Sequence, residues 1–81
     1  MKQFTVEESA AANRLTHYLR IHLQDNLVGV GLKKHSWFKD LTQLVVFIRS
    51  KQGMRMPDML KNNQWENMNV WFEETGTFFP A

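Results

Sequence analysis

Residues 6–25 carry the clearest periodic pattern in the chain, that of an amphipathic helix. Thr5 and Glu8 have the spacing of a capping box, in which each side chain bonds to the backbone N–H of the other residue. Apolar residues then recur every three or four positions, which aligns them on one helix face: Ala11, Leu15, Tyr18 or Leu19, and Leu23. The pattern predicts a helix that packs against the protein by this face.

Residues 27–32 interrupt the helical pattern. Their sequence, Leu-Val-Gly-Val-Gly-Leu, combines two glycines with two β-branched valines, which together lower helix propensity. The segment is predicted to be a loop or a short strand. A strand needs a partner, and residues 44–48 form the only other run with β propensity, so a two-stranded hairpin is the alternative.

Residues 37–52 are predicted to form a second, central helix. Ser36 is a suitable N-cap, and Gly53 stands where a left-handed residue ends a helix. Apolar residues follow at helical spacing, namely Trp37, Leu41, Leu44, Val45 and Ile48. Further apolar residues widen this stripe past half of the circumference, so we expect other elements to cover the helix on both sides.

Two more helices are predicted in the last third of the chain. A short one runs from Pro57 to about residue 61, because proline suits the first helical position, where its missing N–H has no partner anyway. A fourth helix runs from residue 64 to about residue 74, after Asn63 and Glu66 at cap-like spacing. Its apolar side is formed by Trp65, Met68 and Phe72.

These elements together predict an all-α fold, a compact three- or four-helix single domain over residues 1–81, with a short β-hairpin involving residues 27–32 as the departure from it. At 43% hydrophobic residues the composition is too apolar for a disordered chain. The sequence has no Cys, no signal-like segment and no apolar run long enough to span a membrane. We therefore expect a cytoplasmic protein without disulfides.

The net charge of +2 is too small to indicate a partner, but the charges are unevenly distributed. Residues 33–61 carry seven Lys and Arg against two Asp, whereas the last twenty residues carry three Glu and no base. Attraction between these two parts of the chain explains the pattern as well as a charged ligand does.

The order of the predicted helices is similar to that of a helix-turn-helix DNA-binding unit. In this alternative the helix from residue 64 reads the DNA bases through the side-chain amides of Gln64, Asn67 and Asn69. The basic side chains that would neutralise phosphates are Lys51, Arg55 and Lys61. Against it, the would-be recognition helix carries three Glu and no Lys or Arg, while DNA affinity comes largely from phosphate neutralisation. Nucleic acid is therefore the second choice of partner.

A second nucleic-acid hypothesis concerns residues 33–39, where lysines alternate with aromatic residues as on a surface that stacks single-stranded bases. Trp37 is in phase with the apolar stripe of the predicted central helix, however, so we assign it to the core.

Metal binding and catalysis find little support. His17 and His22 are five positions apart, which points them to different sides of a helix, so we expect no metal. The two adjacent Glu pairs are explained by helix ends and do not face each other across a cleft. We expect no enzymatic activity and no cofactor.

Protein binding is favoured because the last third of the chain holds more large apolar side chains than a small helical core needs. Trp and Met are enriched at protein interfaces, and the expected contacts are Met56, Met59, Trp71, Phe78 and Phe79, with Lys33, Lys34 and Arg55 as a basic rim. The opposing interpretation is that these residues close a single core or the seam of a homodimer. We predict a small module that binds and inhibits a larger protein, of the kind that phages and mobile elements encode, the last point resting on size alone.

Overall fold

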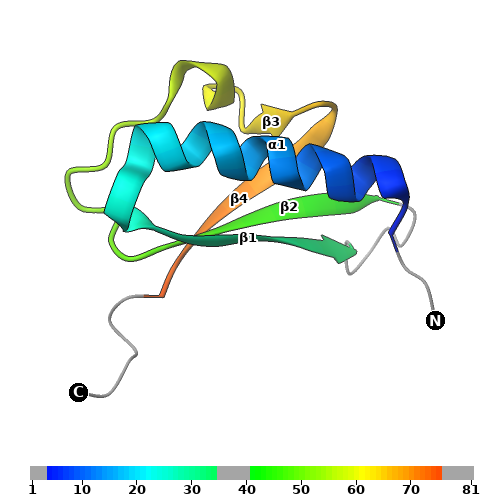
Figure 1. Ribbon diagram of the computed structural model, residues 1–81. Coiled ribbons are helices and arrows are strands. Elements are labelled where there is room, and N and C mark those ends of the chain that lie inside the picture. Colours follow the sequence, from blue (N-terminus) through cyan, green and yellow to red (C-terminus); the bar gives the residue numbers. More distant parts are fainter. Residues whose placement is uncertain (1–3, 35–40, 76–81) are drawn as a thin grey trace.

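The computed structural model describes residues 4–34 and 41–75, which form one α-helix and a four-stranded mixed sheet. The elements are α1 (Val6–Leu23), η1 (Gln24–Asn26), β1 (Leu27–Lys34), β2 (Thr42–Ile48), η2 (Asp58–Leu60), β3 (Gln64–Trp65) and β4 (Met68–Glu74). The strand order is β1-β2-β4-β3, with β2 and β4 parallel and the other neighbours antiparallel. Helix α1 lies across one face of this sheet (Figure 1). The fold is therefore α+β, and the predicted all-α helical bundle is wrong.

Helix α1 is confirmed. The Glu8 backbone N–H donates to Thr5 Oγ1 at 3.0 Å, and the Thr5 N–H donates to Glu8 Oε1 at 2.9 Å, which completes the capping box. Its buried face consists of Ala11, Ala12, Leu15, Leu19 and Leu23. The helix ends two residues earlier than expected because Gln24 adopts a left-handed φ of 52°.

The segment at residues 27–32 is a strand, and its partner is the one that the sequence indicated. β1 pairs with β2 as an antiparallel hairpin, so the predicted pairing of the two segments is confirmed, although they belong to a sheet of four strands and not two. The helix predicted over residues 37–52 is wrong where the structure describes it. Burial alternates strictly along β2. Five consecutive apolar residues at 44–48 fit a period of 3.6 as well as a period of 2, and β-branched side chains then favour the strand.

Residues 64–74 form a second hairpin instead of the predicted fourth helix. β3 and β4 are joined by Glu66 and Asn67, whose φ angles are 49° and 69°. Two successive left-handed residues in a two-residue loop are the signature of a type I′ turn, whose twist matches that of the paired strands. The apolar residues at helical spacing misled the prediction, because the buried positions on β4 are in fact two apart, at Val70 and Phe72.

The connection from β2 to β3 replaces the predicted short helix. After Pro57, which is buried, a single 3₁₀ turn (η2) covers residues 58–60, and Leu60 is completely enclosed. Met54 and Met56 pack against the same core from this connection. The methionines thus fill irregular space beside the sheet, a use that suits their flexible side chains.

The core lies between α1 and one face of the sheet. Its fully buried side chains are Leu15, Leu19, Leu44, Val46, Ile48 and Leu60. Trp65 fastens the β3–β4 hairpin to the helix, because its indole Nε1 donates a buried hydrogen bond of 3.0 Å to the Ala11 carbonyl. The Tyr18 ring lies 5.4 Å from that of Trp65, and its hydroxyl accepts from the Met59 N–H. The helix is therefore linked both to the β3–β4 hairpin and to the connection between β2 and β3.

A solvent-exposed bidentate ion pair also joins α1 to the β3–β4 hairpin. Arg14 donates from Nε and Nη2 to the two carboxylate oxygens of Glu66, both at 2.7 Å. Hydrogen bonding to Arg14 lowers the pKa of the Glu66 carboxyl below its usual value. Glu66 therefore serves the structure through its side chain as well as through its place in the turn.

We expect Leu44→Ala to lower the free energy of unfolding by about 2–5 kcal/mol, because Leu44 is completely buried beneath α1. Val45→Ala is the matched control on the opposite face of the same strand, and should cost about 1 kcal/mol or less. Urea denaturation followed by circular dichroism measures both. Equal losses would contradict the strand assignment, because neighbouring residues of β2 would then be equally enclosed.

We expect Arg14→Met to raise the pKa of the Glu66 carboxyl, because the hydrogen bonds that stabilise its charged form are lost. A folded-state pKa below the unfolded value means that the stabilisation is present at neutral pH and disappears as the pH falls through the folded pKa. NMR titration of the Glu66 side chain in both proteins measures the change. Superimposable titration curves would disprove the role of the pair.

Candidate functional site

No helix of the described residues covers the second face of the sheet (Figure 1). Three rows of residues cross this face, each row contributed by β1, β2 and β4 in that order: Lys33, Gln43 and Asn69; Gly31, Val45 and Trp71; and Gly29, Phe47 and Glu73. We call these nine residues the open face. They alternate along each strand with the residues that pack beneath α1, as the pleat of a strand requires.

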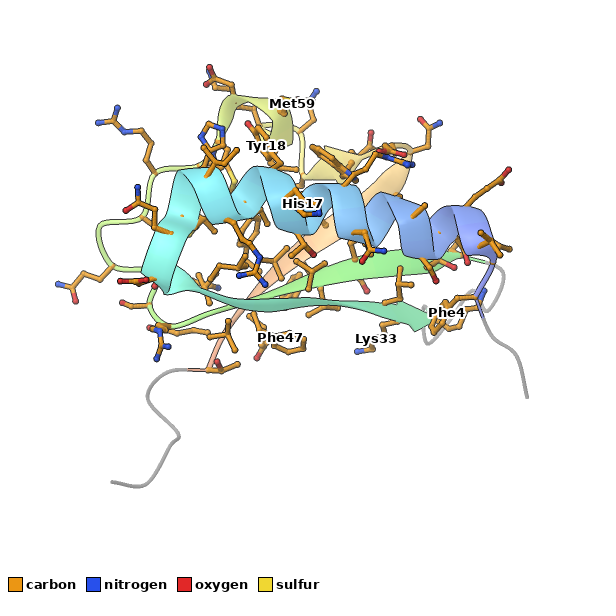
Figure 2. The ribbon with its side chains drawn as sticks, in the orientation of Figure 1. Phe4, His17, Tyr18, Lys33, Phe47 and Met59 are labelled. Carbon is orange, nitrogen blue, oxygen red and sulfur yellow. The ribbon has the colours of Figure 1, made fainter. Side chains whose placement is uncertain are left out.

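The β1 side of the open face is hollowed. Lys33 and Phe47 project from the sheet on the side away from α1 (Figure 2). Gly29 and Gly31 have no side chains to fill the surface beside them, and a Cβ built on Gly31 would meet the Phe47 ring at 3.5 Å. The Phe47 ring therefore leans over Gly31, and a shallow groove forms between β1 and Trp71.

Trp71 is the main apolar group of the open face. It lies opposite Val45 in the β2–β4 register and leaves 54% of its surface exposed. Its indole Nε1 donates to Glu73 Oε1 at 2.7 Å, which holds the ring in one orientation over the sheet. A large ring that is already oriented loses little conformational entropy when another molecule covers it.

The charges of the open face balance. Lys33 and Glu73 are its charged residues, and they occupy diagonally opposite corners of the three rows. Gln43 and Asn69 add neutral amides between them. The face is thus an apolar centre with one cation and one anion at its margins, an arrangement typical of surfaces that bind proteins.

A second groove lies on the other side of Trp71, along the outer part of β4. Trp71 and Gln43 line both grooves, so the indole stands between them. The second groove is lined further by Lys51, Met54, Met56, Asn62, Asn63, Asn69, Val70 and Phe72. It offers amide donors and acceptors beside an aromatic ring, and it adjoins the first groove at Trp71 and Gln43.

Of the partner-binding residues predicted from the sequence, the structure brings Trp71 and Lys33 together on the open face. Lys34 is on the other side of the strand, where its Nζ donates to Thr42 Oγ1 at 3.1 Å and lies over the Phe4 ring. Adjacent residues of a strand point to opposite faces of the sheet, so Lys33 and Lys34 do not form the single basic rim predicted from the sequence.

The remaining partner-binding candidates do not join the open face. Met56 packs against the core from the connection and lines the second groove beside Trp71, while Met59 is 63% exposed beside Tyr18, on the α1 side. Arg55 is exposed in the same connection. Phe78 and Phe79 lie outside the described residues, and their role stays a prediction.

The DNA-binding candidates do not form a recognition helix, because residues 64–74 are strands and the helix-turn-helix geometry is absent from the described chain. Gln64 is on β3, Asn67 in the hairpin turn, and Asn69 on the open face. Lys51 lines the second groove, whereas Lys61 forms an exposed ion pair with Asp58 at 3.4 Å. Asn69 lines the second groove together with Lys51, whereas Arg55 lies beside Tyr18 and His22 of α1, so the predicted readout and phosphate residues do not all share one surface.

The sequence analysis missed Val45, Phe47, Gly31 and Glu73 as members of the site. The available signal was the short apolar run Val70-Trp71-Phe72 between Asn69 and Glu73, which fits a strand as well as a helix. Glycines at every second position of residues 29–31 were a second signal, because an aromatic neighbour often lies over such a column.

No family model, curated protein or solved structure gives a significant match to this chain, so any function proposed for it is based on the geometry described above. Within residues 4–34 and 41–75, no three His, Asp or Glu side chains gather as a metal site requires. No helix in the same residues is both long and apolar enough to cross a membrane.

The two tryptophans that the structure describes should respond differently to removal. Trp65→Ala is expected to lower the free energy of unfolding by about 3–5 kcal/mol, because Trp65 is buried and bonded to α1. Trp71→Ala should cost less than about 1 kcal/mol, because much of the ring is already in solvent. Urea midpoints of the two variants measure the difference, and a comparable loss for Trp71 would assign it to the core instead of to binding.

Proposed function

We propose that this chain is a small protein-interaction module that binds a larger protein and inhibits it by covering part of its surface. The open face is the surface that makes the contact. One observation carries the proposal: the sheet face opposite α1 presents a half-exposed, oriented Trp71 above an apolar floor. The cytoplasmic location and the lack of catalytic activity expected from the sequence belong to the same proposal.

Energetics favour a protein as the occupant of this face. Tryptophan is among the residues that most often dominate binding energy, particularly when it stands at the centre of a contact with apolar neighbours. Trp71 has Val45 beside it and Phe47 one row away. Gln43 and Asn69 stand at the margin, where polar groups can bond to a partner's backbone.

Charge disfavours nucleic acid at the same face. Affinity for nucleic acid comes largely from lysines and arginines that neutralise phosphates. Lys33 is the cation of the open face, Lys34 points to the other side of β1, and Glu73 is bonded directly to the Trp71 indole. A base stacked on Trp71 would bring its phosphates close to the Glu73 carboxylate.

Site-specific photo-crosslinking tests the proposal. A photoreactive phenylalanine analogue at position 47 replaces Phe47 on the open face with little change in shape, and the same analogue in place of Ile21, which is 73% exposed on α1, is the matched control. In lysate we expect a discrete adduct much heavier than two copies of the chain from position 47 only. Trp71→Ala in the position-47 protein should remove that adduct.

The same heavy adducts from both positions would contradict the proposal, because binding would then not depend on the open face. So would a heavy adduct that survives Trp71→Ala unchanged. Circular dichroism of each protein establishes that the fold is intact before illumination.

A further inference from the structure

The open face is complementary to itself in charge. Lys33 stands in the first row on β1, and Glu73 stands in the third row on β4, with Val45 at the centre of the diagonal between them. A two-fold rotation that exchanges these two corners brings a positive corner of each copy onto a negative corner of the other. Such an isologous contact is the commonest form of self-association.

We propose that the open face binds a second copy of this chain, sheet against sheet, with each Lys33 paired to Glu73 of the second copy. The inference rests on the proposed function, because it names an occupant for the same face. When the second copy occupies the face, a larger partner cannot, so self-association holds the chain inactive until a partner displaces it.

The same two-fold axis also brings apolar groups of the two copies into contact. The diagonal axis makes the strands of the two copies cross at roughly 70°, close to the orthogonal class of sheet packing. Phe47 of one copy then lies near Gly31 of the other, where the Phe47 ring of that second copy already lies 3.5 Å from a Cβ built on Gly31. The two Phe47 rings are therefore brought close together.

Other two-fold relations lack this complementarity. An axis parallel to the strands places β1 over β4 without exchanging the rows, so Lys33 meets Asn69 and Glu73 meets Gly29. An axis perpendicular to the strands exchanges the rows and places β1 over β1, so Lys33 meets Gly29 and Glu73 meets Asn69. The charges therefore select the diagonal relation.

The area of the face makes this dimer weak. Three strands of about seven residues have a footprint of roughly 14 by 23 Å, and crossing at about 70° limits the overlap to roughly 14 by 15 Å, or about 420 Å² over two copies. Stable complexes bury about 1,200 Å² or more. A weak dimer suits the proposed role, because a partner that also covers the second groove beside Trp71 buries more surface and wins the competition.

Analytical ultracentrifugation of the full chain at low salt tests the dimer. Between about 10 and 500 μM the weight-average mass of the wild type should rise from 9.6 kDa toward twice that value. Lys33→Glu alone and Glu73→Lys alone should each weaken self-association about tenfold, because like charges then meet at both corners. Arg20→Glu, which makes the same change of charge as Lys33→Glu but on the exposed side of α1, should leave self-association unchanged.

An equimolar mixture of the two single variants is the decisive sample. In the mixed pair, Glu at position 33 of one copy meets Lys at position 73 of the other, and the native Glu73 meets the native Lys33, so both corners are complementary again. The mixture should associate about as strongly as the wild type. The inference is overturned if the wild type stays at 9.6 kDa throughout, or if the mixture associates no better than its components.

The two proposals fail separately. A wild type that stays monomeric removes the second copy as an occupant but leaves the heavy crosslinked adduct from position 47 unaffected. A dimer that responds to the charge swaps, together with only a two-copy adduct in lysate, supports self-association and contradicts binding to a larger protein.

Discussion

The structure depends on one constraint: a single helix can cover only one face of the sheet. Helix α1 buries Leu15 and Leu19 against Leu44, Val46 and Ile48, and every other residue of β2 belongs to that contact. The pleat sends the intervening residues to the opposite side, where the described chain has no second helical layer. Apolar residues there, such as Val45 and Phe47, give the sheet little stability for their size. Their presence on this uncovered face is the observation behind the proposed contact with another molecule.

The helix is fastened to the far end of the sheet by polar contacts. The buried hydrogen bond from Trp65 to the Ala11 carbonyl and the outer pair of Arg14 with Glu66 join α1 to the short β3–β4 hairpin. This junction fixes the start of β4, and the parallel register with β2 carries the placement along to Trp71. Trp71 therefore owes its position to contacts on the opposite side of the sheet.

The sequence predicted local features well and long-range ones poorly. The capping box and the stripe through Leu15 located α1 within two residues, because both signals are contained in the helix itself. The runs at 44–48 and 64–74 were assigned to helices because their apolar residues also fit a helical period, and only pairing with distant strands decides between the two. Trp71 was identified as surplus to the core, but its neighbours on the open face come from β1 and β2, and no spacing along the chain places them together.

The parallel pairing of β2 with β4 has a consequence for the order in which the molecule assembles. The antiparallel hairpin of β1 and β2 closes over a short connection, whereas β4 must return across residues 49–67 and past the 3₁₀ turn before it can pair. Closing the longer loop costs more chain entropy before any contact rewards it, so β4 is the last strand to be added. A chain still emerging from the ribosome can therefore form α1 and the first hairpin without presenting Trp71, and the open face is complete only once β4 has been synthesised and has paired with β2.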